Sequence, residues 1–255
     1  MRTLSKATVV AVLTVTGLAG RPGVAAAQRA FFGEDLFGFP PDFAVASRAT
    51  VFPNASAAQA GFLAALTSSV GTENFEGLAA GTVSPVPLAF PGAGVATLTG
   101  SGIVRKYSVP GEWQGNDRYP TSGDQFFDVN VGSFSIHFDT PVAAFGFFGV
   151  DIGDQGGQLV LDFLSGATTT TVTVPHTLGH ASSTTGAVLF YGRIDTAHPF
   201  TSVVFRNDAG GDPFAFDDMT IGSVAQVATP EPATAGLLAL GLAGVVGCSA
   251  RRRRA

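Results

Sequence analysis

Three side chains suited to sugar recognition lie within a stretch rich in Gly, Asn and Pro. Trp113, Arg118 and Tyr119 occur in GEWQGNDRYPTSGD, which has the composition of a surface loop. A pyranose has apolar C–H faces and hydroxyl groups, so an aromatic face beside hydrogen-bonding groups can bind it. The stretch therefore predicts a ligand-binding loop. The alternative is that its aromatic side chains close one end of a hydrophobic core.

Two aspartates follow an unusually apolar run of residues. Asp151 and Asp154 end the sequence FGFFGVDIGD. Carboxylates in this position can form the polar rim of a ligand site or bind a cation. The alternative is a turn in which the aspartates bond backbone amides and Gly153 adopts a positive φ. Both interpretations place Asp151 and Asp154 directly after a buried strand.

The sequence contains no arrangement typical of a catalytic centre. His176 and His180 have helical spacing, but no Glu follows His176 as the zinc-protease motif requires. The chain also lacks a G-x-S-x-G nucleophile motif and a P-loop. Glycoside hydrolysis needs two carboxylates roughly 5 to 10 Å apart, and no spacing among the acids singles out a pair. We predict no catalytic residues, with a secreted polysaccharide hydrolase as the alternative.

The central part of the chain is strongly acidic. Residues 28–229 contain seven basic and 18 acidic residues, a formal charge of −11, against −5 for the whole chain. A surface with this charge repels the phosphate backbone of nucleic acids, so we predict no nucleic-acid partner. The charge is compatible with divalent cations and with neutral ligands such as sugars.

Residues 72–227 have the composition and pattern of an all-β domain. Gly, Thr, Ser, Val and Phe are abundant, and turn residues divide the sequence into short apolar runs. Phe134, Ile136 and Phe138 alternate with polar residues, as expected for a half-buried strand. The runs predict ten strands: Val95–Leu98, Ile103–Tyr107, Phe126–Val129, Phe134–Phe138, Ala143–Val150, Leu159–Phe163, Thr169–Val174, Val188–Tyr191, Ser202–Arg206 and Phe214–Ile221.

Ten short strands with little helix predict a two-sheet antiparallel β-sandwich. Residues 28–71 are expected to be irregular, apart from one short helix at Ala55–Leu66 with Asn54 or Ser56 as its N-cap. A sandwich of this size does not depend on disulfides for its stability. None can form within the chain, because Cys248 is the only cysteine.

The first 27 residues have the pattern of a cleavable signal peptide. Two basic residues precede the apolar run Ala7–Ala19, and Ala25 and Ala27 form a small-x-small cleavage site. The apolar run is about 13 residues long, whereas a membrane span needs roughly 20. We therefore predict export through the Sec translocon and removal of residues 1–27 by signal peptidase.

Residues 228–255 have the pattern of a membrane-anchored tail. Ala233–Ala250 contains no charge and would span about 27 Å as a helix, which is long enough to cross a bilayer. The basic cluster that follows is expected to stay cytoplasmic, which places the body of the precursor in the periplasm. The flanking residues are Pro230, Glu231 and Pro232 before the span, and Arg251, Arg252, Arg253 and Arg254 after it.

The order of these three parts resembles the PEP-CTERM sorting signal. The resemblance implies that exosortase, a membrane protease-transpeptidase, recognises the Pro-Glu-Pro tripeptide and removes the tail. The body would then reach the cell surface or the extracellular matrix of a Gram-negative bacterium that produces exopolysaccharide and biofilm. A plain tail anchor is the alternative.

The body also resembles domains found beside this signal and, more generally, lectin-like jelly rolls. The resemblance rests on NFEG at 74–77, RYPTSG at 118–123, FGFFGVDIGD at 145–154 and FDDMTIG at 216–222. It implies a structural Ca²⁺ near Glu76, with Asp217 or Asp218 as a further ligand. Neighbouring residues of one strand point to opposite faces, so only one of the two aspartates is expected to bind the ion. The alternative is that these aspartates bond turn amides.

Together these features predict an exported, exosortase-sorted protein of the cell surface or extracellular matrix. We expect it to bind polysaccharide or to serve structurally in the exopolysaccharide, without catalytic activity. A purely structural, adhesin-like protein without a small ligand is a further alternative, which burial of Trp113 and Tyr119 would favour.

Overall fold

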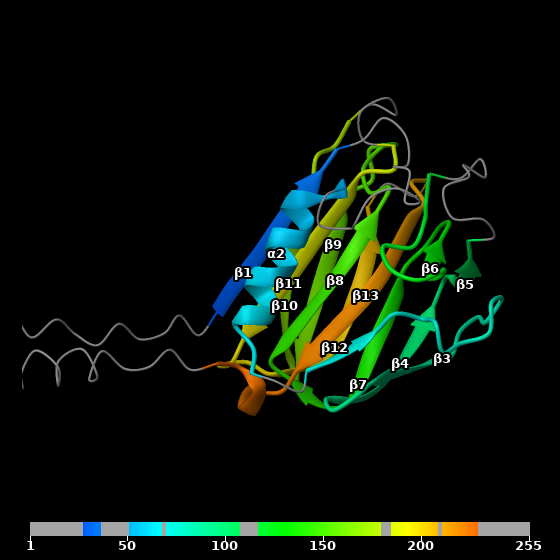
Figure 1. The fold of residues 1–255 in the computed structure, drawn as a ribbon. Coiled ribbons are helices and arrows are strands. Elements are labelled where there is room, and N and C mark those ends of the chain that lie inside the picture. Colours follow the sequence, from blue (N-terminus) through cyan, green and yellow to red (C-terminus); the bar gives the residue numbers. More distant parts are fainter. Residues whose placement is uncertain are drawn as a thin grey trace, which may run out of the picture. The chain divides into compact units, whose positions relative to one another are not determined.

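The structure is a computed structural model that describes residues 28–36, 51–67, 70–107, 117–179, 185–208 and 211–228 (Figure 1). Ala25, Ala27, Trp113, His180 and the whole tail from Pro230 to Arg254 lie outside these ranges. The predicted membrane span at 233–250 is therefore outside the described residues. Within them, no helix combines the length and the hydropathy that crossing a membrane requires.

The described chain forms two antiparallel sheets, which confirms the predicted sandwich. The first sheet has seven strands, and β2 (Gly71–Glu73) joins it by pairing with β13. The order of its other strands is β1 (Gln28–Asp35), β11 (Val188–Asp195), β8 (Ala144–Val150), β13 (Phe214–Gly222), β6 (Gln125–Val129) and β5 (Ile103–Lys106).

The second sheet has six strands and pairs antiparallel throughout. Their order is β10 (Thr168–Thr173), β9 (Leu159–Ser165), β12 (Phe200–Asn207), β7 (Phe134–Val142), β4 (Gly94–Gly100) and β3 (Val86–Phe90). Helix α2 (Pro53–Ala64) and the 3-10 helix η1 (Val224–Gln226) complete the described elements.

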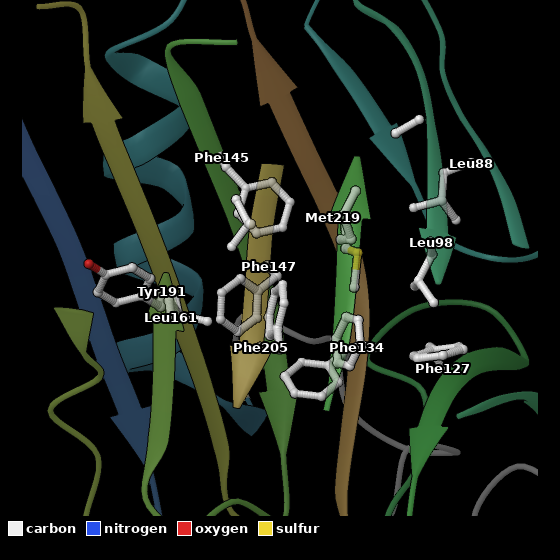
Figure 2. Packing of buried hydrophobic residues seen from close by; sticks show 14 of the residues in the cluster. Leu88, Leu98, Phe127, Phe134, Phe145, Phe147, Leu161, Tyr191, Phe205 and Met219 are labelled. Atoms are coloured by element: carbon white, nitrogen blue, oxygen red, sulfur yellow. The ribbon is translucent and has the colours of Figure 1, made fainter. Parts of the chain in front are cut away.

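A phenylalanine-rich core fills the space between the two sheets (Figure 2). Phe147 of β8 lies against Phe205 of β12 with ring centroids 5.1 Å apart, and Phe134 of β7 stacks on Phe205 at 4.3 Å. Such ring pairs each stabilise a fold by about 0.5 to 1.5 kcal/mol beyond the area that they bury. The abundance of Phe in the sequence is therefore explained by packing.

A second hydrophobic core lies on the outer face of the seven-stranded sheet, beneath α2 (Figure 1). Phe62 of the helix contacts Phe190 of β11, with ring centroids 5.7 Å apart. Gly146 and Gly192 pair across β8 and β11, and a Cβ on either would come within about 3 Å of the Phe62 ring. Both faces of this sheet are thus buried, which accounts for the unbroken apolar run of β8.

The start of α2 is held by a residue distant in sequence. Asp35, at the end of β1, accepts hydrogen bonds from the backbone amides of Asn54 at 3.2 Å and Ala55 at 2.9 Å. The predicted helix is confirmed, but neither Asn54 nor Ser56 caps it, and it begins at Pro53. A carboxylate at this helix end is favourable because free amides and the helix dipole meet there.

The outer face of the six-stranded sheet is exposed to solvent. Thr99, Ser135 and Thr171 point to this face, whereas their sequence neighbours Leu98 and Ile136 are buried. We call the following residues the hydroxyl face: Thr97, Thr99, Ser135, His137, Thr169, Thr171 and Ser202. The molecule therefore has one sheet buried on both sides and one sheet open on one side.

All ten predicted strands are present, and three further strands were missed. Residues 28–35 are not irregular, because they form β1, an edge strand that pairs with β11 and packs against α2. The sandwich thus begins before residue 72. Strand β3 was missed because of its prolines, but Pro87 is compatible with an edge strand, whose free side needs no amide donor.

Candidate functional site

Three aspartate carboxylates converge where β8 ends. Asp117, Asp151 and Asp154 each place a ligand oxygen within 4.8 Å of the others. Among the described residues, no other group of three Asp, Glu, His or Cys side chains meets this criterion. Asp151 and Asp154 are buried, whereas Asp117 is partly exposed.

The local backbone explains how Asp151 and Asp154 reach this position. Asp151 follows β8 directly and adopts φ 62°, so the chain turns sharply at the strand end. Its Oδ1 accepts the amide of Gly186 at 2.9 Å, which is a contact to a distant loop and not a bond within its own turn. The predicted positive φ of Gly153 is confirmed, at 93°. The Asp151 side chain, however, bonds the amide of Gly186 and not an amide of its own turn.

A fourth carboxylate, Asp212, adjoins Asp154. Asp212 Oδ2 accepts the amide of Gly157 at 2.7 Å. Asp212 Oδ1 and Asp154 Oδ1 are both fully buried and have no hydrogen-bond donor among the residues that the structure describes. The two carboxyl groups lie within hydrogen-bonding reach of each other, and such a bond exists only when one of them is protonated. We call Asp117, Asp151, Asp154 and Asp212 the Asp154 cluster.

Burial and mutual repulsion disfavour negative charge in the Asp154 cluster. Burial raises the pKa of Asp151 to about 8, and the neighbouring Asp154 and Asp117 add to this rise. Burial likewise raises the pKa of Asp154, and it raises the pKa of Asp212 to about 7 with Asp154 contributing. Four carboxyl groups in this setting need protons or a cation to compensate their charge. An all-oxygen set of this kind suits hard cations such as Ca²⁺.

The ligands predicted for Ca²⁺ from the jelly-roll resemblance have other partners. Asp217 is fully buried, and its Oδ2 accepts the amides of Thr121 at 2.7 Å and Ser122 at 2.9 Å. Its Oδ1 accepts the amide of Asp218 at 2.7 Å. Asp218 accepts the Ser122 hydroxyl at 2.8 Å. We call Asp217 and Asp218, with their donors in Thr121 and Ser122, the Asp217 cluster.

Two expectations about this region need correction. Asp217 and Asp218 do not point to opposite faces, because a bulge with φ 46° at Asp218 turns both towards Thr121 and Ser122. Glu76 does not join them in a group of three, and its Oε1 accepts the amides of Asp124 at 2.7 Å and Gln125 at 2.6 Å. Asp217 and Glu76 accept backbone amides, whereas Asp218 accepts the hydroxyl of Ser122. The three carboxylates do not converge as a set of Ca²⁺ ligands.

Burial and the Asp218 charge raise the pKa of Asp217, against the amide donors that lower it. This rise in the pKa agrees with the structure, because Asp217 is fully enclosed and Asp218 lies beside it.

Of the three residues predicted to bind sugar in this loop, the structure describes Arg118 and Tyr119, and both side chains contact other parts of the protein. Tyr119 is fully buried and donates its hydroxyl to the carbonyl of Gly186 at 2.5 Å. Arg118 is mostly buried, and its Nε lies 2.6 Å from Asp128 Oδ1. Tyr119 therefore offers no exposed ring to a ligand, which corrects the prediction for this residue and supports the core-closing alternative. Trp113 lies outside the described residues.

His176 is buried and has a structural contact. Its Nε2 accepts the amide of Leu159 at 3.0 Å, so this nitrogen has no proton. Its Nδ1 lies 3.2 Å from the carbonyl of Thr177, to which it can donate in the neutral tautomer. Burial lowers the pKa of His176. The ring therefore joins the 176–179 loop to the start of β9.

Sequence reasoning missed Asp117 and Asp212 as members of the Asp154 cluster. Both lie in turn-rich segments, GNDRYP and NDAGGDP, whose composition indicates loops but not their neighbours. Their approach to Asp154 depends on contacts between residues more than 30 positions apart. No local pattern could have placed them there.

Comparison with known proteins identifies the C-terminal end of this β-sandwich protein. Residues 228–254 match the PEP-CTERM protein-sorting motif, which confirms the predicted sorting signal at Pro230–Pro232 and Arg251–Arg254. The motif implies a surface protein that exosortase processes. No curated protein matches the chain.

Several solved structures are similar to part of the chain. The cleaved K2 adhesin domain of Lys-gingipain is 13% identical, with a TM-score of 0.39, and the match covers 60% of this chain and 98% of that domain. TmCBM61 in complex with β-1,4-galactotriose is 16% identical over 59% and 94%, with a TM-score of 0.31. The family 22 carbohydrate-binding module of Clostridium thermocellum Xyn10B is 14% identical over 62% and 95%, with a TM-score of 0.27. These TM-scores support no conclusion about function.

Proposed function

We propose that the chain is exported, that exosortase removes its tail, and that the β-sandwich then works without catalysis in the extracellular polysaccharide. In this proposal the signal peptide directs the chain through the Sec translocon of a Gram-negative bacterium. Signal peptidase cleaves after Ala27, and the 233–250 segment holds the precursor in the inner membrane until processing. The mature body contacts polysaccharide through the hydroxyl face.

The observation behind this proposal is the open side of the six-stranded sheet. Register places Thr97 opposite His137, His137 opposite Ser202, and Thr169 opposite Leu164, which itself faces Ser202. A parallel row contains Thr99 and Ser135, whose hydroxyl oxygens lie 3.0 Å apart. Side-chain hydroxyls both donate and accept, so such rows can hydrogen-bond the hydroxyl groups of a neutral polysaccharide.

Charge and burial are compatible with this use. The acidic body discourages contact with polyanions, but a neutral polysaccharide meets no such repulsion. The clustered carboxylates Asp151, Asp154 and Asp212 are each at most 7% exposed, so a polysaccharide chain does not reach them in this structure. This burial favours a binding or structural role over the alternative of a hydrolase.

A second candidate is a purely structural, adhesin-like protein with no small ligand. The burial of Tyr119 favours it, because the aromatic ring expected to stack on sugar belongs to the core. In that case the hydroxyl face stays solvated and the protein acts through contacts with other surface components.

The sorting part of the proposal is tested in the native host by intact mass and cell fractionation. Wild-type protein is expected in the surface or medium fraction, beginning near Gln28 and ending near Pro232. A variant with alanine at Pro230, Glu231 and Pro232 is expected to keep its tail and remain in the inner membrane. If both forms retain Arg251–Arg254 in the inner membrane, exosortase processing is refuted and the tail is an anchor.

The binding part is tested by pull-down of the purified chain on neutral and acidic polysaccharides, including that of the host. Thr99→Glu and Thr169→Glu add charge to the hydroxyl face and are expected to weaken binding at least about tenfold, the effect of 1.4 kcal/mol. The matched control Val224→Glu adds the same charge at an exposed residue of η1 and should bind as wild type does. If the wild type binds no polysaccharide, the structural candidate replaces the binding one.

A further inference from the structure

We propose that the Asp154 cluster binds one Ca²⁺ ion, with Asp117, Asp151 and Asp154 as direct ligands and Asp212 completing the acidic set. This inference goes beyond the proposed function and does not depend on polysaccharide binding. The site differs from the one that the jelly-roll resemblance implies at Glu76, Asp217 and Asp218.

The first observation is the geometry of the three carboxylates. Ligand oxygens of Asp117, Asp151 and Asp154 lie within 4.8 Å of one another. Oxygens that bind one Ca²⁺ at 2.3 to 2.6 Å can be separated by up to about 5 Å across the ion. The three oxygens therefore have the spacing of a coordination sphere, and no movement of the backbone is needed to bring them together.

The second and independent observation is the absence of donors around two of the buried oxygens. Asp154 is 7% exposed and Asp212 is 2% exposed, yet Oδ1 of each has no hydrogen-bond donor among the described residues. A buried acceptor without a donor normally costs about 1 to 3 kcal/mol, and more when it is charged. A cation bound by Asp154 would provide a partner on the side that lacks donors, and its charge would also offset that of the neighbouring Asp212.

Among the described residues, the cationic side chain that acts on this cluster is Arg118, and it is committed elsewhere. Arg118 follows Asp117 in sequence, and its charge acts on both Asp151 and Asp154. Its Nε nevertheless pairs with Asp128 at 2.6 Å, and its NH2 group donates to Asn130 at 2.8 Å. The guanidinium therefore forms its ion pair with Asp128 of β6 and not with Asp151 or Asp154.

The chemistry of the ligands selects the ion. The three ligands and Asp212 provide only oxygen, without the nitrogen or sulfur that zinc and other transition metals prefer in proteins. Ca²⁺ accepts irregular sets of carboxylates completed by carbonyls and water, whereas Mg²⁺ demands near-ideal octahedral geometry. Carboxylates from segments that are separate in sequence fit the more permissive ion.

Binding would join segments that are distant in sequence. Asp117 precedes the segment that leads to β6, Asp151 and Asp154 follow β8, and Asp212 precedes β13. An ion held by all three segments would stiffen the loops at these strand ends. The body would then depend on calcium for part of its stability, and the calcium would come from outside the cell.

The test is calorimetric titration of the purified full-length chain with CaCl₂ after removal of metals with EDTA. One ion is expected to bind per chain. The melting temperature should rise by roughly 5 to 10 °C when calcium reaches about 100 times its Kd. Excess EDTA should reverse the rise, and MgCl₂ at the same concentration should produce less than half of it.

Two variants distinguish a calcium ligand from a structural residue. Asp154→Asn should abolish calcium binding, yet in EDTA it should melt at or above the wild-type temperature, because its amide can donate to Asp212. Asp212→Asn should weaken calcium binding, and in EDTA it too should melt at or above the wild-type temperature. This second variant keeps the test valid if one of the two fails to fold. The matched control Asp139→Asn, at an exposed residue of β7, should bind calcium as the wild type does.

Two results would overturn the proposal. One is a wild type that gives no heat of binding and the same melting temperature in EDTA and in about 10 mM CaCl₂, well above the Kd of extracellular calcium modules. The carboxylates would then share protons instead. The other is a folded Asp154→Asn variant that keeps the full calcium response, which would place the ion elsewhere.

Discussion

The Asp217 cluster and the Asp154 cluster contain the same kind of residue at similar burial, but they differ in the donors around them. Asp217 is fully buried and accepts three backbone amides and a hydroxyl. Asp154 and Asp212 are also buried, but each has an oxygen that no donor from the described part of the chain reaches. Buried carboxylates with enough donors fix loops, whereas buried carboxylates without them need a proton or a cation.

The comparison also shows why an acidic motif alone is a poor guide to a metal site. The FDD sequence at 216–218 was the better candidate by resemblance, yet its aspartates are saturated by Thr121 and Ser122. For the DIGD sequence at 151–154, a ligand site, a cation site and a simple turn were all possible interpretations. Hydrogen-bond donors from distant segments decide between the two roles, and these donors are not visible in a short motif.

The largest effect is expected from removing the Asp217 carboxylate. Asp217→Ala leaves the buried amides of Thr121, Ser122 and Asp218 without acceptors, so we expect a loss of about 3 to 5 kcal/mol in the free energy of unfolding. Urea unfolding followed by circular dichroism measures it. The exposed control Asp139→Ala should change stability by less than about 0.5 kcal/mol. A loss below about 1 kcal/mol for Asp217→Ala would show that the donors of this cluster contribute little.

A smaller effect is expected from coupling within the Asp154 cluster. In EDTA, Asp154→Asn and Asp212→Asn each replace the same carboxylate pair with an amide–carboxylate pair. The double variant should therefore be less stable than the sum of the single effects predicts, by about 1 to 2 kcal/mol. Urea unfolding of the four proteins measures this coupling. Additive effects would show that the two carboxyl groups do not interact, which would remove the contrast with the Asp217 cluster.

A pH effect of similar or smaller size is expected at His176, which accepts an amide as Asp217 does. Burial lowers the pKa of His176 in the folded protein below its value near 6.5 in the unfolded chain. The unfolded chain then binds more protons between these two values, so stability is complete above about pH 6.5 and falls as the pH decreases towards the folded pKa. We expect this ring to account for a measurable part of the stability lost between pH 7 and pH 5.

The measurement for His176 compares the pH dependence of the urea midpoint in the wild type and in His176→Gln. The variant should stay close to the wild type in stability at pH 7, because the Gln amide oxygen can accept the Leu159 amide in place of the ring nitrogen. It should also lose less stability than the wild type between about pH 7 and pH 5. Equal slopes for the two proteins would contradict a neutral His176 in the folded state.

The smallest effect is expected on the open sheet, where water surrounds the ions. Asp162 accepts two hydrogen bonds from Arg206, at 2.6 and 3.0 Å, and this pairing lowers the pKa of Asp162. The arginine side chain is 44% exposed, so Asp162→Asn should cost less than about 1 kcal/mol. The same unfolding assay in low and high salt checks it. If Asp162→Asn lowered the free energy of unfolding as much as Asp217→Ala, burial would not explain the difference between these two carboxylates.

The sandwich itself could be predicted because strand patterns are local. Alternation along β7 reflects one-sided burial, and the unbroken apolar run of β8 reflects two-sided burial. Strand β1 was missed, because its pairing with β11 and its cover by α2 come from segments distant in sequence. The helix was found, but its cap, Asp35, lies 20 residues before Ala55.

The candidate site could be predicted only in part, for the same reason. Asp151 and Asp154 were identified because they end an apolar run, which is a local feature. Asp117 and Asp212 join them through contacts across 34 and 58 positions in the chain. The burial of Tyr119 likewise depends on Gly186, which is 67 positions away.

The most direct test of this account is anomalous diffraction from crystals of the protein grown with calcium. The account predicts one anomalous peak, bounded by the carboxylates of Asp117, Asp151 and Asp154, and no peak between Glu76, Asp217 and Asp218. That result would confirm that a cation binds where buried carboxylates lack donors. A peak at Asp217 and Asp218, or no peak at Asp154 in calcium-saturated crystals, would contradict it.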